Sequence, residues 1–267
     1  MLIQIVGAGV VGQATGRGFA RFGHRVIFCD TDEEKLEPLR HEFETTTEPK
    51  NADVHFVCVP EGEVRSAVER LRNLVLKPHL KHTIEGDLTV TCQFGLVVIR
   101  STVPPGTAKR ISETGMHVCS NPEFLREAVA EYEFLNPRMV VIGECCPRHG
   151  DVLEQLYRPF RAPIVRTDPT TAEMVKLAVN CHLACLISFW NEVHLICERL
   201  GVNSHEVGAI ASLDPRVSPY GARMHGRPFG GRCLPKDLNQ VLELCERMRY
   251  KPILLKAVKR LNEEISK

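Results

Sequence analysis

A glycine pattern in the first twelve residues limits the folds that this chain can adopt. Gly7, Gly9 and Gly12 are spaced as G-x-G-x-x-G, directly after the apolar run Leu2–Val6 and at the start of the amphipathic stretch Val11–Phe22. Glycine permits a tight turn, the close approach of a ligand to the backbone and close packing of a helix on a strand. The pattern therefore predicts a strand, a turn and a helix in succession, which is the opening of a βαβ unit.

The same rhythm continues through the first half of the chain. Short, nearly continuous apolar runs predict strands covered on both faces, and amphipathic stretches between them predict helices. The predicted strands are Leu2–Val6, Arg25–Cys29, Val54–Val59, Leu96–Arg100, His117–Ser120, Met139–Ile142 and Ile164–Arg166. The predicted helices are Val11–Phe22, Asp32–Phe43, Glu61–Leu76 and Gly106–Thr114, and residues 76–94 are predicted to be irregular. We interpret residues 1–168 as a Rossmann-type α/β domain with a doubly wound parallel sheet.

From residue 169 the strand pattern stops, and the sequence predicts an all-helical domain over residues 169–267. The predicted helices are a long central one, Ala172–Leu200, followed by Asn203–Ala211, Lys236–Met248 and Ile253–Ser266. A loop rich in glycine, proline and arginine, Leu213–Arg232, is predicted to separate the second and third of these.

Composition excludes several classes of protein. The net charge of +1 over 267 residues argues against nucleic acid or an anionic membrane as the main partner. We find no signal-peptide pattern and no apolar run of the roughly 20 residues that a membrane span needs. The 11 cysteines are scattered and odd in number, which favours free thiols in a reducing cytoplasm.

The glycine turn also predicts a dinucleotide site. The amides at Val10 and Val11 open the helix, whose N-terminus attracts phosphate. Asp30 ends the second predicted strand, at the position where an acid binds the adenosine ribose. A carboxylate there would repel the extra phosphate of NADP. We therefore expect NAD as the cofactor, with Gly7, Gly9, Val10, Val11, Gly12 and Asp30 at its site.

Two polar segments follow predicted strands, where ligands of open α/β sheets bind. Ser101 and Thr102 precede a Pro-Pro turn, and their hydroxyls are either ligand contacts or part of a simple strand-to-helix turn. Glu123 and Glu127 are four residues apart, so a helix would place them on one face. They are either an acid–base pair or solvated acids at a helix start.

Lys176 and Asn180 are also four apart, near the start of the long predicted helix. A buried lysine there would suit acid–base work, and a lysine extending to the surface is the alternative. Cys233 follows Gly230 and Gly231 and precedes Lys236 and Asp237 by about one helical turn, which suits covalent catalysis through sulfur.

The remaining cysteines do not predict a metal site. Cys145, Cys146 and His149 have no second cluster at zinc spacing, and Cys181 and Cys185 are more simply core residues.

Taken together and in order, these segments resemble the UDP-glucose/GDP-mannose dehydrogenase family. The resemblance rests on the glycine pattern with Asp30, STVPPGT at 101–107, NPEFLRE at 121–127, AEMVKLAVN at 172–180, SFWNEV at 188–193, LDPR at 213–216 and GGRCLPKD at 230–237. It implies the NAD-dependent oxidation of a nucleotide sugar's primary alcohol, such as that of UDP-glucose, to a carboxylate. Family members usually continue into a second Rossmann-like domain, so the resemblance implies a short form that lacks the UDP-binding domain.

The resemblance implies a role for each candidate residue. Cys233 would attack the aldehyde and carry a thiohemiacetal and then a thioester. Lys176, Asn180 and Asp237 would assist in proton transfer, and Glu123 with Thr102 would activate the hydrolytic water. Ser101 and Glu127 would lie near the nicotinamide. Arg216, Phe229, Gly230 and Gly231 would contact the substrate, and residues 172–200 would form a homodimer interface.

Two alternatives remain open at this point. A two-electron β-hydroxyacid-type dehydrogenase also uses a Lys/Asn pair on a helix but does not need Cys233. A non-catalytic NAD-binding subunit would depend on a domain supplied by another chain.

Overall fold

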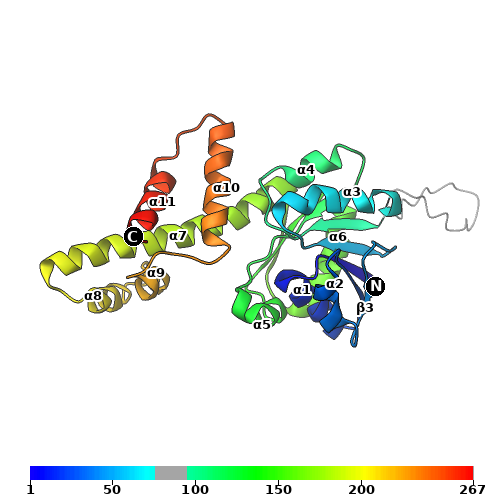
Figure 1. Cartoon of the computed structure of the whole chain (residues 1–267), viewed down its shortest axis with the longest axis horizontal. Helices are drawn as coiled ribbons and strands as arrows, with labels where there is room; N and C mark the ends of the chain where they lie inside the picture. Colours follow the sequence, from blue (N-terminus) through cyan, green and yellow to red (C-terminus); the bar gives the residue numbers. More distant parts are fainter. Residues whose placement is uncertain (76–94, 267) are drawn as a thin grey trace, which may run out of the picture. The chain divides into compact units, whose positions relative to one another are not determined.

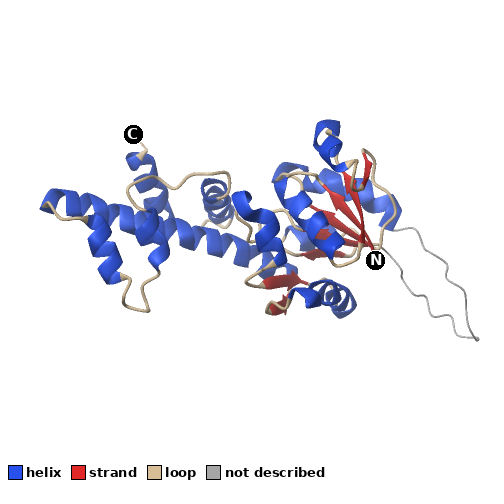
Figure 2. Ribbon diagram, turned by 90° about the horizontal axis from the view of Figure 1, so that it is seen from below, coloured by secondary structure: helices blue, strands red, loops and turns tan. Residues whose placement is uncertain are grey.

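The structure, a computed structural model, describes residues 1–75 and 95–266 (Figure 1). The predicted irregular segment 76–94 lies outside the described residues. The chain divides into two compact units, Met1–Met174 and Val175–Lys267. Strands occur in the first unit, and the described part of the second consists of helices and loops (Figure 2).

The first unit is built on one eight-stranded sheet with the order β3-β2-β1-β4-β5-β6-β7-β8. The strands are β1 Leu2–Val6, β2 Arg25–Cys29, β3 Glu44–Thr46, β4 Val54–Val57, β5 Leu96–Ile99, β6 Val118–Ser120, β7 Val140–Gly143 and β8 Ile164–Thr167. Strands β1 to β6 pair in parallel, as do β7 and β8. The reversal of the strand order at β1 places a topological switch point beside the glycine turn, where ligands of this fold bind.

Helices cover both faces of this sheet. They are α1 Val10–Arg21, α2 Glu33–Leu36, α3 Val64–Val75, α4 Thr107–Ser112, α5 Ala130–Leu135 and α6 Pro147–Tyr157, with short 3₁₀ turns η1 Glu37–Leu39, η2 Glu61–Glu63, η3 Glu127–Val129 and η4 Arg158–Phe160. One face packs on α1, α5 and α6 through an aromatic cluster around Phe19 and Phe134. The other face packs on α3 and α4 (Figure 1). The predicted doubly wound α/β fold is confirmed.

The structure of this unit differs from the sequence predictions at several places. The predicted helix Asp32–Phe43 is only α2 followed by η1, because Pro38 lacks the N–H that would continue the α-helix. Strand β3 was not predicted, since its sequence Glu-Thr-Thr has no apolar run and it lies at the sheet edge. Strand β7 runs antiparallel to β6, with Ser120 opposite Gly143, so the sheet is not wholly parallel.

The second unit is organised around α7 Pro169–Leu200, which confirms the predicted long helix. It is followed by α8 Ser204–Ala211, α9 Pro219–Met224, α10 Leu234–Arg247 and α11 Ile253–Ile265. Helix α9 lies within the predicted loop, and its Pro219 occupies the first helical turn behind the Ser218 cap. Leu177, Ala184, Leu238 and Val258 belong to the core that joins α7, α10 and α11.

Helix α7 is long and apolar enough to cross a membrane by length and composition alone. The expectation that no apolar run approaches the length of a membrane span is therefore wrong by this measure. Polar residues interrupt the apolar ones along α7, but they are too few to make the helix polar on average. Half of the relevant window is buried inside the protein, as in the core helix of a globular unit, so this is weak evidence for a span.

Candidate functional site

The glycine turn between β1 and α1 has the geometry that a dinucleotide needs. Gly7 has φ +102°, and a Cβ there would lie 2.5 Å from the Cys58 carbonyl oxygen. A Cβ on Gly12 would lie 1.9 Å from the Gly7 carbonyl oxygen, so only glycine lets the helix pack this closely. A Cβ on Gly9 would meet nothing within 4 Å. The turn is therefore tight on its inner side and open where a pyrophosphate would approach the first amides of α1.

Asp30 is fixed beside this turn. Its Oδ2 accepts a hydrogen bond of 2.7 Å from the Ala8 amide, and its Oδ1 accepts one of 2.9 Å from the Asp32 amide. The carboxylate therefore stands at the end of β2, next to the glycine turn, in a fixed orientation. The residues of this site fit NAD, whose ribose hydroxyls would meet Asp30 and whose phosphates would meet the amides that begin with Val10 and Val11.

Ser101 and Thr102 follow β5 at the same edge of the sheet. The Ser101 hydroxyl lies 2.6 Å from the Val59 carbonyl oxygen, to which it donates, and this bond ties the loop after β5 to the loop after β4. The next turn begins α4, whose first amides are held by Glu173. That carboxylate accepts from Gly106 at 2.6 Å, from Thr107 at 3.1 Å and from Ala108 at 2.9 Å. The sequence analysis missed Glu173, which lies 67 residues from Gly106.

The expectation that Glu123 and Glu127 share a helix face is wrong. Glu123 lies in a loop outside any helix and accepts a 2.6 Å hydrogen bond from the Leu125 amide, whereas Glu127 opens η3. Arg126 has extended backbone angles, which end any helical register between the two acids. Glu123 is 8% exposed and Glu127 is exposed to solvent, so the two carboxyl groups have different environments.

A buried network anchors the segment that carries Glu123. Asn121 Oδ1 accepts from Arg100 Nη1 at 2.6 Å and from the Tyr157 hydroxyl at 2.5 Å, and Asn121 Nδ2 donates to the Val141 carbonyl oxygen. Burial raises the pKa of Tyr157 to about 12, so this hydroxyl stays protonated and donates. Asn121 links β6, β7 and α6, and it thereby holds the start of the NPEFLRE segment.

In the second unit, Cys233 is the N-cap of α10 and is exposed. The Asp237 amide donates to the Cys233 carbonyl oxygen at 2.9 Å, so the carboxylate stands one helical turn beyond the thiol. Asp237 is 0% exposed. The helix start thus separates an accessible sulfur from a buried carboxylate.

Polar groups surround the buried Asp237. Asn180 Nδ2 donates to Asp237 Oδ2 at 2.5 Å, and Lys236 Nζ lies 2.6 Å from Asp237 Oδ1. The lysine contact is an ion pair without hydrogen-bond geometry, so within the described residues Oδ1 has no hydrogen-bond donor. Lys176 is 3% exposed, which decides against a lysine extending to the surface. The structure therefore brings Asn180 and Asp237 together, with Lys236 paired to the second carboxylate oxygen.

The loop before Cys233 is fastened by a residue that the sequence analysis missed. Asn262 on α11 accepts from the Phe229 amide at 2.7 Å and donates to the Phe229 carbonyl oxygen at 3.0 Å. The Phe229 ring is buried in the core of the second unit. Gly231 has φ +76°, and a Cβ on it or on Gly230 would meet nothing within 4 Å, so the backbone is open there.

Arg216 is exposed and paired with Asp214 at 2.6 Å.

Comparison with known proteins shows the family to which the chain belongs. The NAD binding domain of the UDP-glucose/GDP-mannose dehydrogenase family matches residues 1–69 and 37–161, and the central domain of that family matches residues 170–264. UDP-glucose 6-dehydrogenase TuaD of Bacillus subtilis is 32% identical over 290 residues, which cover 98% of this chain and 63% of TuaD. The chain therefore spans about two thirds of the length of the curated relatives that it matches.

Solved structures with a similar fold include members of this family. A UDP-glucose dehydrogenase from Pyrobaculum islandicum superposes with a TM-score of 0.86 at 30% identity, covering 98% of this chain and 68% of that one. A 3-hydroxyisobutyrate dehydrogenase from Mycobacterium tuberculosis has a TM-score of 0.74 at 15% identity, over 98% of this chain and 92% of that one, which is a likeness of fold alone. With both family domains matched in order, this chain belongs to the UDP-glucose/GDP-mannose dehydrogenase family.

Proposed function

We propose that this chain oxidises the primary alcohol of a nucleotide sugar, UDP-glucose first among the candidates, to a carboxylate with the consumption of two NAD. The observation that carries the proposal is the buried Asp237, which is held by Asn180 and Lys236 one helical turn beyond the exposed Cys233. A four-electron oxidation needs a covalent hold on the aldehyde, and Cys233 is an exposed thiol at a helix N-terminus, where the dipole favours a thiolate.

The chemistry divides among the residues of this chain. NAD, when bound, would accept a hydride in each of the two oxidations. Lys176 would take the alcohol proton in the first oxidation. The Cys233 sulfur would then add to the aldehyde carbon, and the resulting thiohemiacetal would become a thioester on loss of the second hydride to NAD and of its hydroxyl proton to Lys176. Attack by water would break the carbon–sulfur bond, releasing the carboxylate and restoring the thiol.

Other residues would position water and charge. Asn180 and Asp237 would orient a water molecule, whose O–H would donate to the Asp237 carboxylate. Glu123 is buried and fixed by the Leu125 amide, as suits a base that activates water with Thr102. Ser101 and Glu127 would border the nicotinamide, and Arg216, Phe229, Gly230 and Gly231 would contact the substrate.

We also propose that the chain works as a homodimer in the cytoplasm. Phe189, Ile196 and Leu200 are 56%, 52% and 73% exposed, and their i, i+7, i+11 spacing makes one apolar stripe along α7. A stripe of this kind favours pairing with a second copy. The ten cysteines of the described residues are free thiols, which suits a reducing compartment.

The proposal is tested by the number of NADH formed per substrate consumed, for wild type and Cys233→Ser, with UDP-glucose, GDP-mannose, other nucleotide sugars and the free sugars. We expect two NADH from one nucleotide sugar with wild type, and a block at or after the aldehyde with Cys233→Ser. One NADH that does not depend on Cys233 would indicate a two-electron hydroxyacid-type dehydrogenase. NAD binding without turnover, restored by a partner protein, would indicate a subunit that needs another chain.

A further inference from the structure

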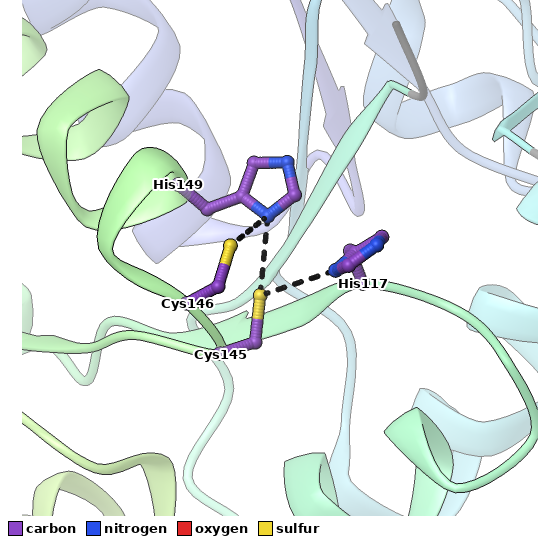
Figure 3. Close-up of side chains that lie close together, drawn as sticks. All are labelled: His117, Cys145, Cys146 and His149. Atoms are coloured by element: carbon purple, nitrogen blue, oxygen red, sulfur yellow. Dashed lines mark hydrogen bonds between the residues drawn. The ribbon is translucent and has the colours of Figure 1, made fainter. Parts of the chain in front are cut away.

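We propose that His117, Cys145, Cys146 and His149 bind one zinc ion. Their potential ligand atoms all lie within 4.8 Å of one another (Figure 3). The prediction of no metal site considered only neighbours in the sequence, where Cys145, Cys146 and His149 lack a fourth ligand. The fold supplies that ligand from His117, which lies 28 residues before Cys145.

The antiparallel strand pair explains how His117 reaches this place. Ser120 of β6 lies opposite Gly143 of β7. Three residues back from Ser120 is His117, and three residues on from Gly143 is Cys146, so the antiparallel direction brings these two positions to the same end of the pair. A fully parallel sheet would have separated them. The site therefore depends on the strand reversal that the sequence analysis missed.

The distances suit a tetrahedral ion. Zinc bonds of about 2.3 Å to sulfur and about 2.0 Å to nitrogen place neighbouring ligand atoms about 3.4–3.8 Å apart in a tetrahedron. His149 Nδ1 lies 3.2 Å from both Cys145 Sγ and Cys146 Sγ, and His117 Nδ1 lies 3.9 Å from Cys145 Sγ. The whole set of ligand atoms lies within 4.8 Å, so side-chain shifts of up to about 1 Å would complete the tetrahedron.

The electrostatic setting also suits a dication. Two thiolates and two neutral imidazoles give a site of no net charge around Zn²⁺. Cys146 caps α6 and Cys145 precedes it, so both thiolates would face the positive end of the helix dipole. Glu144 is paired with Arg166 at 2.6 Å and is therefore occupied elsewhere. Cys145 and Cys146 are half-buried rather than sealed, which leaves an entry path for the ion.

Cys119 would orient the zinc ligand Cys145 without binding the ion itself. Its sulfur lies 3.6 Å from Cys145 Sγ and accepts a hydrogen bond of 3.4 Å from the Cys145 amide. A buried S–H in this place can donate to the Cys145 thiolate and orient it. The same proximity makes a Cys119–Cys145 disulfide the main rival.

The site's position indicates a structural role. His117 precedes β6, so the cluster lies at the amino edge of the parallel strands, whereas the glycine turn and Asp30 lie at their carboxyl edge. Four protein ligands also close the coordination sphere, as in structural rather than catalytic zinc sites. Zinc would fasten β6, β7 and α6 to one another and thereby brace the segment that begins at Asn121.

The test is the metal content and the cobalt spectrum of the full chain. We expect one zinc per chain after reduction, zinc supply and dialysis, and a cobalt-substituted protein with intense visible bands of tetrahedral Co²⁺ and a thiolate charge-transfer band. X-ray absorption should give two sulfurs at about 2.3 Å and two nitrogens at about 2.0 Å. Less than a tenth of an equivalent of zinc, or an intact mass two units lower from a Cys119–Cys145 disulfide in the protein as isolated without reductant, would overturn the proposal.

Variants separate this site from adventitious binding. Cys146→Ser and His117→Gln should each weaken zinc binding by more than about 100-fold in competition with a chromogenic chelator. Cys185→Ser, a half-buried cysteine on α7, is the matched control and should bind zinc as wild type does. Equal affinity in Cys146→Ser and wild type would refute the assignment. If a variant fails to fold, the wild-type cobalt spectrum and a zinc-dependent rise in Tm decide the question.

Discussion

Asn180 and Asp237, 57 residues apart in the sequence, are joined by a hydrogen bond of 2.5 Å from the Asn180 amide to Asp237 Oδ2. This contact connects α7 to the first turn of α10, directly beyond Cys233. It supplies Oδ2 of the buried carboxylate with a hydrogen-bond donor from a different helix.

Removal of the Asn180 side-chain amide should leave Asp237 Oδ2 without the hydrogen bond from α7. We expect Asn180→Ala to lower the free energy of unfolding by about 2–3 kcal/mol, because a buried charged group loses its donor. Urea denaturation measures this, with Asn239→Ala on α10 as the control, expected to change it by less than about 1 kcal/mol. The double variant Asn180→Ala/Asp237→Ala should cost less than the sum of the single variants. Additive costs would show that the bond contributes nothing to stability.

Glu173 should make stability depend on pH. Burial raises the pKa of its carboxyl group to about 7, although three backbone amides lower it in part. Since the unfolded chain has a pKa near 4.5, the folded state holds the proton more tightly, and the associated stability is present below pH 4.5 and is lost as the pH rises to about 7.

The size of this effect is about 3 kcal/mol across that range. We expect the difference in free energy of unfolding between wild type and Glu173→Gln to fall by this order as the pH rises from 4.5 to 8, measured by urea denaturation at each pH. Glu113→Gln, at the C-terminal end of α4, is the control, and its free energy of unfolding should depend on pH as that of wild type does. Parallel profiles for wild type and Glu173→Gln would contradict the raised pKa.

Asp30 should determine the choice of cofactor. We expect Asp30→Ser to weaken NAD binding by about 10–100-fold, because the ribose hydroxyls lose a carboxylate acceptor. The same change should improve NADP relative to NAD, since it removes a repulsive charge. Calorimetric titration with both nucleotides measures the two effects, and Asp32→Asn serves as the neighbouring control. An unchanged NAD affinity would place the adenosine ribose elsewhere.

Asn262 should hold the loop before Cys233 in place. We expect Asn262→Ala to cost about 1–2 kcal/mol of stability, because both polar groups of the Phe229 backbone lose a partner. Hydrogen exchange should speed up over residues 229–232, whereas Glu263→Gln on the solvent side of α11 should not change it. Unchanged exchange in Asn262→Ala would show that the core packing of Phe229 is sufficient to hold the loop.

The apolar stripe on α7 should control association. We expect Phe189→Asp and Ile196→Asp to convert the proposed dimer to monomer at micromolar concentration, because each buries a charge in the interface. Sedimentation velocity measures the result, and Val165→Asp, an exposed apolar residue of β8, is the control. A wild-type protein that is already monomeric would contradict the proposed dimer.

Local sequence patterns were sufficient for most elements of the fold. Strand and helix periodicity placed β1, β2, α1 and α7 within a few residues of their observed bounds, because each pattern is repeated along one continuous segment. The patterns did not predict β3, which forms at the edge of the sheet without an apolar run. They also predicted too long a helix at α2, which ends where Pro38 follows.

The sequence by itself determined the order of the α/β and helical parts, the glycine turn with Asp30, and the presence of a cysteine at a helix start, because a glycine's backbone freedom and a helix's period act over a few neighbouring residues. Only the tertiary structure decided that Glu123 is separated from Glu127, that Asn262 binds Phe229, and that His117 meets Cys145. These contacts join residues far apart in the chain, so they depend on strand direction and packing, which no local pattern specifies.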